Sequence, residues 1–144
     1  MRPKVQIVFD CASPSRLAEF YAKVLNYKVQ EPPEGFASWR DALKAWGVPE
    51  EDWDSASAIV DPEGTGPRIY FQRMETPKLG KNRVHIDVNA SGGPGATLER
   101  RKEQVRAKAE ALRALGASEH SVVEENGEYW IVMLDPEGNE FCVQ

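Results

Sequence analysis

The same four-residue turn occurs twice in this sequence. Asp-Pro-Glu-Gly stands at 61–64 and again at 135–138, each time between two strand-like stretches. Proline presets the bend of such a turn and glycine accepts the positive φ that completes it, so both copies are predicted to join neighbouring strands. Asp61 and Asp135 are separated by about half of the 144 residues. The repeat therefore indicates that the chain contains a duplicated unit.

The elements around the two turns follow the same order. Alternation of polar and apolar residues predicts strands, and apolar residues spaced three and four apart predict helices. Each half then contains a strand, a helix and three further strands. The strands are expected at 4–10, 26–31, 55–61 and 68–74 and at 83–89, 121–125, 128–134 and 140–144, and the helices at 13–25, where Ser13 is the expected cap, and 96–115.

This order of elements predicts the fold class. We expect an α+β protein made of two pseudo-symmetric βαβββ modules, paired to form a cupped mixed sheet with the helices on its outer face. The whole chain, 1–144, is expected to be a single domain, with module one at about 1–78 and module two at about 79–144. A chain of this length buries roughly 68–70% of its unfolded surface, so it needs no disulfide to fold.

Module one carries a tryptophan-rich insertion at about 35–53, which holds Trp39, Trp46 and Trp53. Packing against the sheet edge, a lid over a pocket and a dimer contact all remain open for these residues, because aromatic side chains are frequent in each setting. The fourth tryptophan, Trp130, lies on a predicted strand and is expected to pack beneath the second helix.

Charge and hydropathy exclude two classes of partner. The net charge is −5, whereas nucleic-acid binding depends on lysine and arginine contacts to phosphate. No apolar run approaches the roughly 20 residues that cross a bilayer. The N-terminus continues as an alternating strand rather than as the apolar core of a signal peptide. We therefore expect a cytoplasmic protein with no membrane or nucleic-acid partner.

The strands next to each module's ends carry polar side chains on one face and apolar side chains on the other. A helix covers the apolar face, so the polar faces are expected to line a concave space that admits a ligand. This pattern predicts a pocket for a small organic molecule. The polar faces comprise Gln6 and Asp10, then Arg68, Tyr70 and Gln72, then Arg83, His85 and Asp87, and finally Glu140, Cys142 and Gln144.

His85 lies in the middle of "RVHIDVN" and is one of two histidines. Three roles remain open for it: a hydrogen bond to Asp87, an acid/base group of the pocket, or a metal ligand. The other histidine, His120, is expected at the surface. Cys142 is expected to be a small buried strand residue.

Three segments resemble the vicinal oxygen chelate superfamily, which includes glyoxalase I, extradiol dioxygenases and the bleomycin- and fosfomycin-resistance proteins. The chain is most similar to the small bacterial glyoxalase-like domain proteins. The resemblance covers nearly the whole chain and implies paired βαβββ modules and a homodimer. It rests on "DCASPSRLAEFYAKVLNY" at 10–27, "RIYFQRMETPKLGKNRVHIDV" at 68–88 and "LDPEGNEFCVQ" at 134–144.

The resemblance also implies positions for a divalent metal. Metal-dependent relatives hold one ion with four side chains, and by position these fall on Gln6, Gln72, His85 and Cys142. Imidazole and carboxylate ligands suit Ni²⁺, Fe²⁺ and Mn²⁺, and His85 alone is such a ligand here. We therefore expect no metal; if one binds, those four residues are its predicted ligands, and Zn²⁺ accepts histidine together with thiolate.

The resulting expectation is a glyoxalase-like protein that binds a small organic molecule, with His85 as its candidate catalytic residue. If it is an enzyme, the resemblance implies a lyase or isomerase. A metal-free sequestration protein of the antibiotic-resistance type and a metal-dependent dioxygenase are the alternatives. The remaining pocket residues are expected to be Gln6, Tyr70, Gln72, Arg83, Asp87 and Cys142.

Overall fold

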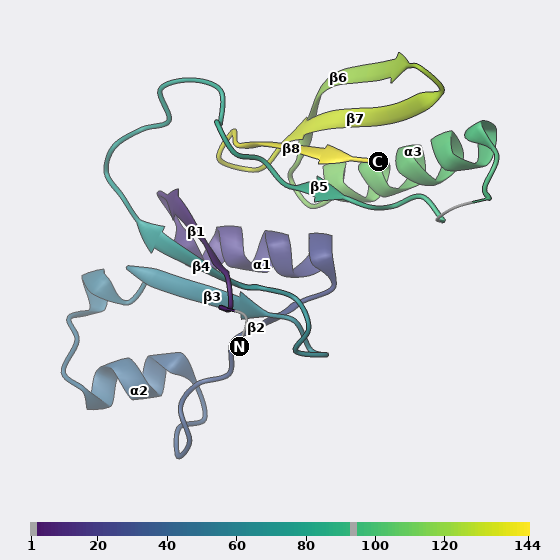
Figure 1. The fold of residues 1–144 in the computed structure, drawn as a ribbon. Coiled ribbons are helices and arrows are strands. Elements are labelled where there is room, and N and C mark those ends of the chain that lie inside the picture. Colours follow the sequence, from purple (N-terminus) through teal and green to yellow (C-terminus); the bar gives the residue numbers. More distant parts are fainter. Residues whose placement is uncertain (1–2, 93–94) are drawn as a thin grey trace. The chain divides into compact units, whose positions relative to one another are not determined.

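A computed structural model describes residues 3–92 and 95–144, so residues 1–2 and 93–94 of the predicted modules lie outside the described residues. The chain divides into two compact units, Met1–Pro77 and Lys78–Gln144. Each unit contains one four-stranded mixed sheet and a long helix (Figure 1). The α+β class and the two βαβββ modules predicted from the sequence are thus confirmed, with the strands hydrogen-bonded in two sheets.

The first unit has strand order β1-β4-β3-β2. β1 is parallel to β4, and the other two pairings are antiparallel. The insertion between β2 and β3 forms a short helix and a 3-10 turn. The elements are β1 (Gln6–Cys11), α1 (Pro14–Leu25), β2 (Lys28–Val29), α2 (Trp39–Ala45), η1 (Glu50–Asp52), β3 (Ala56–Val60) and β4 (Arg68–Arg73).

An aromatic cluster joins α1 to its sheet. The Tyr21 ring lies 4.9 Å from the Phe9 ring, and Phe9 lies 5.4 Å from Phe71, measured between centroids. Tyr21 and Phe71 are fully buried, and each such side chain stabilises the fold by about 1.5–3 kcal/mol. This packing fixes which face of the sheet α1 covers, and it leaves Arg68 and Tyr70 on the other face.

The sequence predicted that the Ser13 side chain caps α1. In the structure Ser13 is at the N-cap position, but its side chain makes no capping hydrogen bond. Asp54, which precedes β3, supplies the cap instead. Its Oδ1 accepts a hydrogen bond from the Ser15 backbone N–H at 2.7 Å, and its Oδ2 accepts one from the Ser13 hydroxyl at 3.1 Å. A carboxylate is favoured there because the first backbone N–H groups of a helix lack partners within the helix.

The second unit has strand order β5-β8-β7-β6, with β5 parallel to β8. The apolar face of α3 packs on β7, and the buried side chains beneath it include Ile131, Met133 and Phe141. Thr97 caps α3 by accepting from the Arg100 N–H. The elements are β5 (Asp87–Val88), α3 (Leu98–Arg113), β6 (Ser118–Glu125), β7 (Glu128–Leu134) and β8 (Glu140–Val143).

Two predictions for this unit are wrong. The strand expected at 83–89 is reduced to β5, and Val84 is 82% exposed instead of packed beneath a helix. β5 pairs with β8 through Asp87 opposite Cys142 and Val88 opposite Val143, and the strand does not continue into the residues before Asp87. Trp130 does not pack beneath α3, because its neighbours Tyr129 and Ile131 occupy that face of β7.

The two Asp-Pro-Glu-Gly turns have the same geometry. Asp61 Oδ1 accepts from the Glu63 N–H at 2.9 Å, and Asp135 Oδ1 accepts from the Glu137 N–H at 2.8 Å. In both turns the glycine N–H donates to the aspartate carbonyl at 3.0 Å. These glycines have φ of +71° and +84°, which a side chain would disfavour. The sequence repeat thus corresponds to a structural repeat.

Among the helices of residues 3–92 and 95–144, none combines the length and the apolar character that crossing a membrane requires.

Candidate functional site

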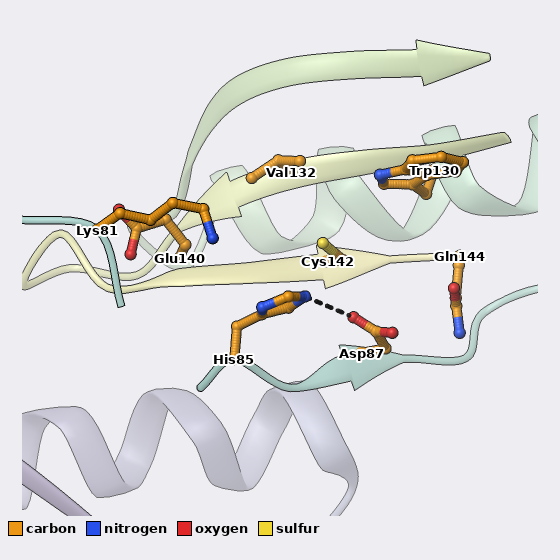
Figure 2. A pocket seen from close by; sticks show the side chains of 8 residues that line it. All are labelled: Lys81, His85, Asp87, Trp130, Val132, Glu140, Cys142 and Gln144. Carbon is orange, nitrogen blue, oxygen red and sulfur yellow. Dashed lines mark ion pairs between the residues drawn. The ribbon is translucent and has the colours of Figure 1, made fainter. Parts of the chain in front are cut away.

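The second unit carries a cavity of about 390 Å³, which we call the His85 pocket. It lies on the face of the sheet opposite α3. On β8 the alternate residues Phe141 and Val143 are buried toward the helix, so Glu140 and Cys142 face the pocket. Its lining residues, drawn in Figure 2, are Lys81, His85, Asp87, Trp130, Val132, Glu140, Cys142 and Gln144.

Three chemically reactive side chains meet in this pocket. His85 Nε2 lies 3.3 Å from Asp87 Oδ1, and both side chains are partly exposed. Cys142 lies on the neighbouring strand β8 (Figure 2). One ligand atom of each residue lies within 4.8 Å of the others. Register places Asp87 directly opposite Cys142 in the β5–β8 pair, so the short strand β5 is what assembles the group.

Burial raises the pKa of the Cys142 thiol, and the negative charge of Asp87 raises it further. Lys81 acts in the opposite direction. A thiolate is the nucleophilic form of cysteine, and the neutral thiol is favoured here. Cys142 on its own is therefore poorly suited to nucleophilic attack.

Glu140 anchors the loop that leads into the site. Its carboxylate accepts from the Asn82 backbone N–H at 2.8 Å and from Lys78 Nζ at 3.0 Å. These two contacts lower the pKa of the Glu140 carboxyl to about 2. Since both oxygens are already engaged, Glu140 holds residues 78–82 against β8, and this position brings Lys81 to the pocket.

The residues predicted for the site in the first unit do not form one group. Gln6 lies opposite Arg68 and Gln72 lies opposite Asp10, at the two ends of the β1–β4 pair. Gln6 Oε1 accepts from Arg68 Nη1, and Gln72 Nε2 donates to Asp10 Oδ1, both at 2.7 Å. The structure therefore does not bring Gln6 and Gln72 together.

The first unit has a cavity of its own, of about 380 Å³, and Tyr70 lines it. Aromatic side chains of the insertion, Trp39 and Trp53, also line this cavity, which we call the tryptophan pocket. Its polar side chains include Arg68 and Gln30. The insertion thus covers part of the sheet face that the sequence predicted to be open.

Some residues at the His85 pocket were missed by the sequence analysis, and Arg83, the one further residue of the second unit that was predicted for the pocket, does not line it. Arg83 is exposed, and Lys81 from the same loop lines the pocket instead. Trp130 and Val132 were missed because β7 is apolar on both faces, so alternation could not tell which face turns toward the helix. In the structure Tyr129 and Ile131 are buried, which shows that they face the helix and that Trp130 and Val132 face the pocket.

The donor set at the His85 pocket suits a zinc ion better than the other metals considered. Zn²⁺ binds histidine nitrogen, thiolate sulfur and carboxylate oxygen in four-coordinate sites, and catalytic sites keep one position open. His85, Asp87 and Cys142 supply one ligand of each kind from within the second unit. Nickel, iron and manganese sites rely on imidazole and carboxylate ligands, of which this group offers two.

Comparisons with known proteins agree with the predicted resemblance. A family model described as a glyoxalase-like domain matches residues 6–144. No curated protein is significantly similar in sequence. A glyoxalase/bleomycin resistance protein/dioxygenase family enzyme from Burkholderia phytofirmans has a similar structure, with a TM-score of 0.62 and 15% identity over 96% of this chain and 94% of that one.

The fosfomycin resistance protein FosX from Listeria monocytogenes is also similar in structure. It has a TM-score of 0.62 and 12% identity over 100% of this chain and 91% of that one. A variant of that FosX was crystallised with Mn(II) and a dihydroxypropylphosphonic acid, and its TM-score is 0.61 at 11% identity, with 100% and 92% of the two chains covered. At identities this low, the structural similarity shows that these proteins share a fold with this chain.

Proposed function

Since this chain belongs to the glyoxalase-like domain family, we propose that it binds a small organic molecule in the His85 pocket and transfers a proton on that molecule through His85. The observation that carries the proposal is the His85–Asp87 pair, 3.3 Å apart, at the wall of the cavity. A cavity of about 390 Å³ is of the size that holds small ligands, about 300–1,000 Å³.

The two ring nitrogens of His85 have different tasks in this proposal. Nε2 faces Asp87, whose carboxylate holds and orients the ring. Nδ1 is then the atom that exchanges a proton with the bound molecule. Imidazole is the side chain most often used for such transfer, and it contributes about 10²–10⁴-fold to a rate.

The other lining residues favour a molecule with an apolar part and an oxygen function. Trp130 and Val132 offer apolar surface on β7, and Lys81 brings a positive charge to the same cavity. A carbonyl compound fits both, because removal of a proton next to the carbonyl places negative charge on its oxygen. Lys81 is suited to stabilise that charge.

The test follows proton exchange on a simple carbonyl compound. Hydroxyacetone is incubated with the protein in D₂O, and loss of its C–H signals is recorded by NMR. We expect His85→Ala to slow the exchange by about 10²-fold, while His120→Ala leaves it unchanged. His120 is the matched control, because it is the second histidine and is exposed. Equal exchange in wild type and His85→Ala would contradict the proposal; binding without exchange would favour a sequestration protein.

A second candidate function uses a bound zinc ion, and the cluster of His85, Asp87 and Cys142 is the observation that favours it. These residues would hold the ion. When bound, zinc polarises a carbonyl or other oxygen of the ligand as a Lewis acid. Cys142 would bind the ion as a thiolate and would release its thiol proton to solvent on binding, which its raised pKa opposes; His85 would direct a ring nitrogen toward the ion.

Cobalt substitution separates the two candidates. The protein is titrated with Co²⁺, and thiolate-to-cobalt charge-transfer absorption is measured. We expect Cys142→Ser to abolish this absorption if the site exists, while Cys11→Ser, at the other buried cysteine, retains it. Absence of the band in the wild type rejects the zinc candidate and leaves the proton-transfer proposal standing.

Light scattering of the same samples tests the homodimer that the resemblance implies.

A further inference from the structure

The tryptophan pocket of the first unit has the composition of a ligand site. It lies on the face of the sheet opposite α1, and all its lining residues belong to the first unit. None of them lines the His85 pocket. Its floor includes Tyr70 of β4 and Ala56 of β3, and its walls include Trp39 and Leu43 of α2 and Trp53.

The two tryptophans present ring carbons to the cavity because their polar atoms are already satisfied. Trp39 Nε1 donates to the Gln30 carbonyl oxygen at 2.7 Å, and Trp53 Nε1 donates to the Val48 carbonyl oxygen at 2.9 Å. These hydrogen bonds also fix how the indoles are oriented. An oriented aromatic surface favours a flat, apolar ligand that can stack on it.

Arg68 places a fixed positive charge at the same cavity. Its Nε donates to Gln30 Oε1 and its Nη1 donates to Gln6 Oε1, both at 2.7 Å, and its guanidinium lies 5.3 Å from the Tyr70 ring centroid. Both acceptors are neutral amides. Within residues 3–92 and 95–144, no carboxylate lies at ion-pair distance from this guanidinium.

Two other arginines of the chain illustrate the ion pairs that Arg68 does not make. Arg73 pairs with Asp52 and Arg101 pairs with Glu128, each at 2.9 Å. Arg68 is half-buried and held in place without such a countercharge. The one acidic side chain that lines the cavity, Asp54, is engaged by Ser13 and Ser15 at the start of α1. A preoriented guanidinium with free donors is suited to a carboxylate.

We propose that the tryptophan pocket binds a planar aromatic carboxylate. The ring system lies against Trp39, Leu43 and Trp53, and the carboxylate accepts hydrogen bonds from the Arg68 guanidinium. This site goes beyond the proton transfer proposed for the His85 pocket, because the residues that carry it all belong to the first unit.

The test compares two ligands of nearly the same shape, of which one carries a carboxylate and the other a neutral amide. Binding of 2-naphthoate and of the uncharged 2-naphthamide is measured by calorimetry on the full chain. We expect the carboxylate to bind at least about tenfold more tightly, the difference that one charge-assisted hydrogen bond produces. Arg68→Gln is expected to remove this preference. Equal binding of the two compounds to the wild type would overturn the proposal.

The aromatic wall is tested with matched tryptophan variants. Trp39→Ala is expected to weaken 2-naphthoate binding by about tenfold. Trp46→Ala is expected to leave it unchanged, because Trp46 is 55% exposed and does not belong to the lining residues. An equal loss in both variants would contradict the assignment.

Two further variants guard against misfolding and against confusion with the other pocket. Ala56→Phe fills the cavity from an exposed strand position and should abolish binding without disturbing the core. His85→Ala should leave 2-naphthoate binding intact, whatever its effect on proton exchange. Retained binding in Ala56→Phe, or binding lost in His85→Ala, would overturn the location of the site.

Discussion

Asp61 and Asp135 hold their turns by the same hydrogen bond, in which the carboxylate accepts from the backbone N–H two residues later, at 2.9 Å and 2.8 Å. The two residues differ in surroundings. Asp135 is buried and also accepts from the Asn139 backbone and side chain, whereas the Asp61 turn is more exposed. This difference allows the contribution of each turn to be separated.

Asp135→Ala is predicted to lower the free energy of unfolding by about 2–4 kcal/mol, because it leaves the Glu137 and Asn139 backbone N–H groups without their acceptor in a buried turn. Denaturant unfolding measures the change. Asp61→Ala should lower the free energy of unfolding by a smaller amount. The control is Glu63→Ala, at an exposed position of the equivalent turn. An Asp135→Ala protein as stable as the control would contradict this reading of the turn.

The Asp61 turn is predicted to weaken in acid. The Gly66 and Glu63 backbone N–H groups and the Thr65 hydroxyl lower the pKa of the Asp61 carboxyl to about 2 from its model-compound value of 3.8. Because the folded pKa is the lower one, this stabilisation is complete above the unfolded pKa and is lost as the pH falls toward 2. Asp61→Asn should therefore lose less thermal stability than wild type between about pH 5 and pH 2. Parallel curves would exclude the effect.

Neighbouring residues on β7 are predicted to have opposite roles. Ile131 is buried beneath α3, so Ile131→Ala should lower the free energy of unfolding by about 2–4 kcal/mol. Trp130 faces the His85 pocket, so Trp130→Ala should cost less stability. The effect on ligand binding should be the reverse: Trp130→Ala should reduce the thermal shift produced by hydroxyacetone more than Ile131→Ala does. A larger loss of stability in Trp130→Ala would show that the faces are assigned incorrectly.

The position of the Tyr27 side chain is predicted to leave room only for glycine at position 66. A Cβ at position 66 would collide with the Tyr27 hydroxyl oxygen. Gly66→Ala should therefore destabilise the first unit, and Tyr27→Phe in the same protein should recover part of the loss, because it removes that oxygen. A double-mutant cycle by thermal unfolding measures the coupling. Additive effects of the two substitutions would contradict the proposed clash.

The sequence predicted most of the architecture because the relevant signals are local. Alternation located β4 and β8, and helical spacing located α1 and α3 to within a few residues. The duplicated turn predicted the two modules. The length of β5 could not be predicted, because alternation shows which residues suit a strand and does not show how many of them pair with β8.

The candidate site was predicted less completely. His85, Asp87 and Cys142 were singled out from their strands, and the structure brings them together. Lys81 and Trp130 were not, because a loop position and a strand that is apolar on both faces give no directional signal. The tryptophan pocket likewise depends on how the insertion folds back over β3 and β4. The spacing of the tryptophans in the sequence does not specify how the insertion folds.

The matching turns occupy the same place in both units, directly before the last strand of each sheet. Each unit is stabilised by its aspartate turn and by a core that its long helix covers, and the cavity lies on the other face of the sheet. The exposed sheet faces of the two units carry different side chains. The cavity of the first unit presents a guanidinium among indoles, and that of the second presents an imidazole beside a thiol, so one module architecture supports two different sets of chemical groups.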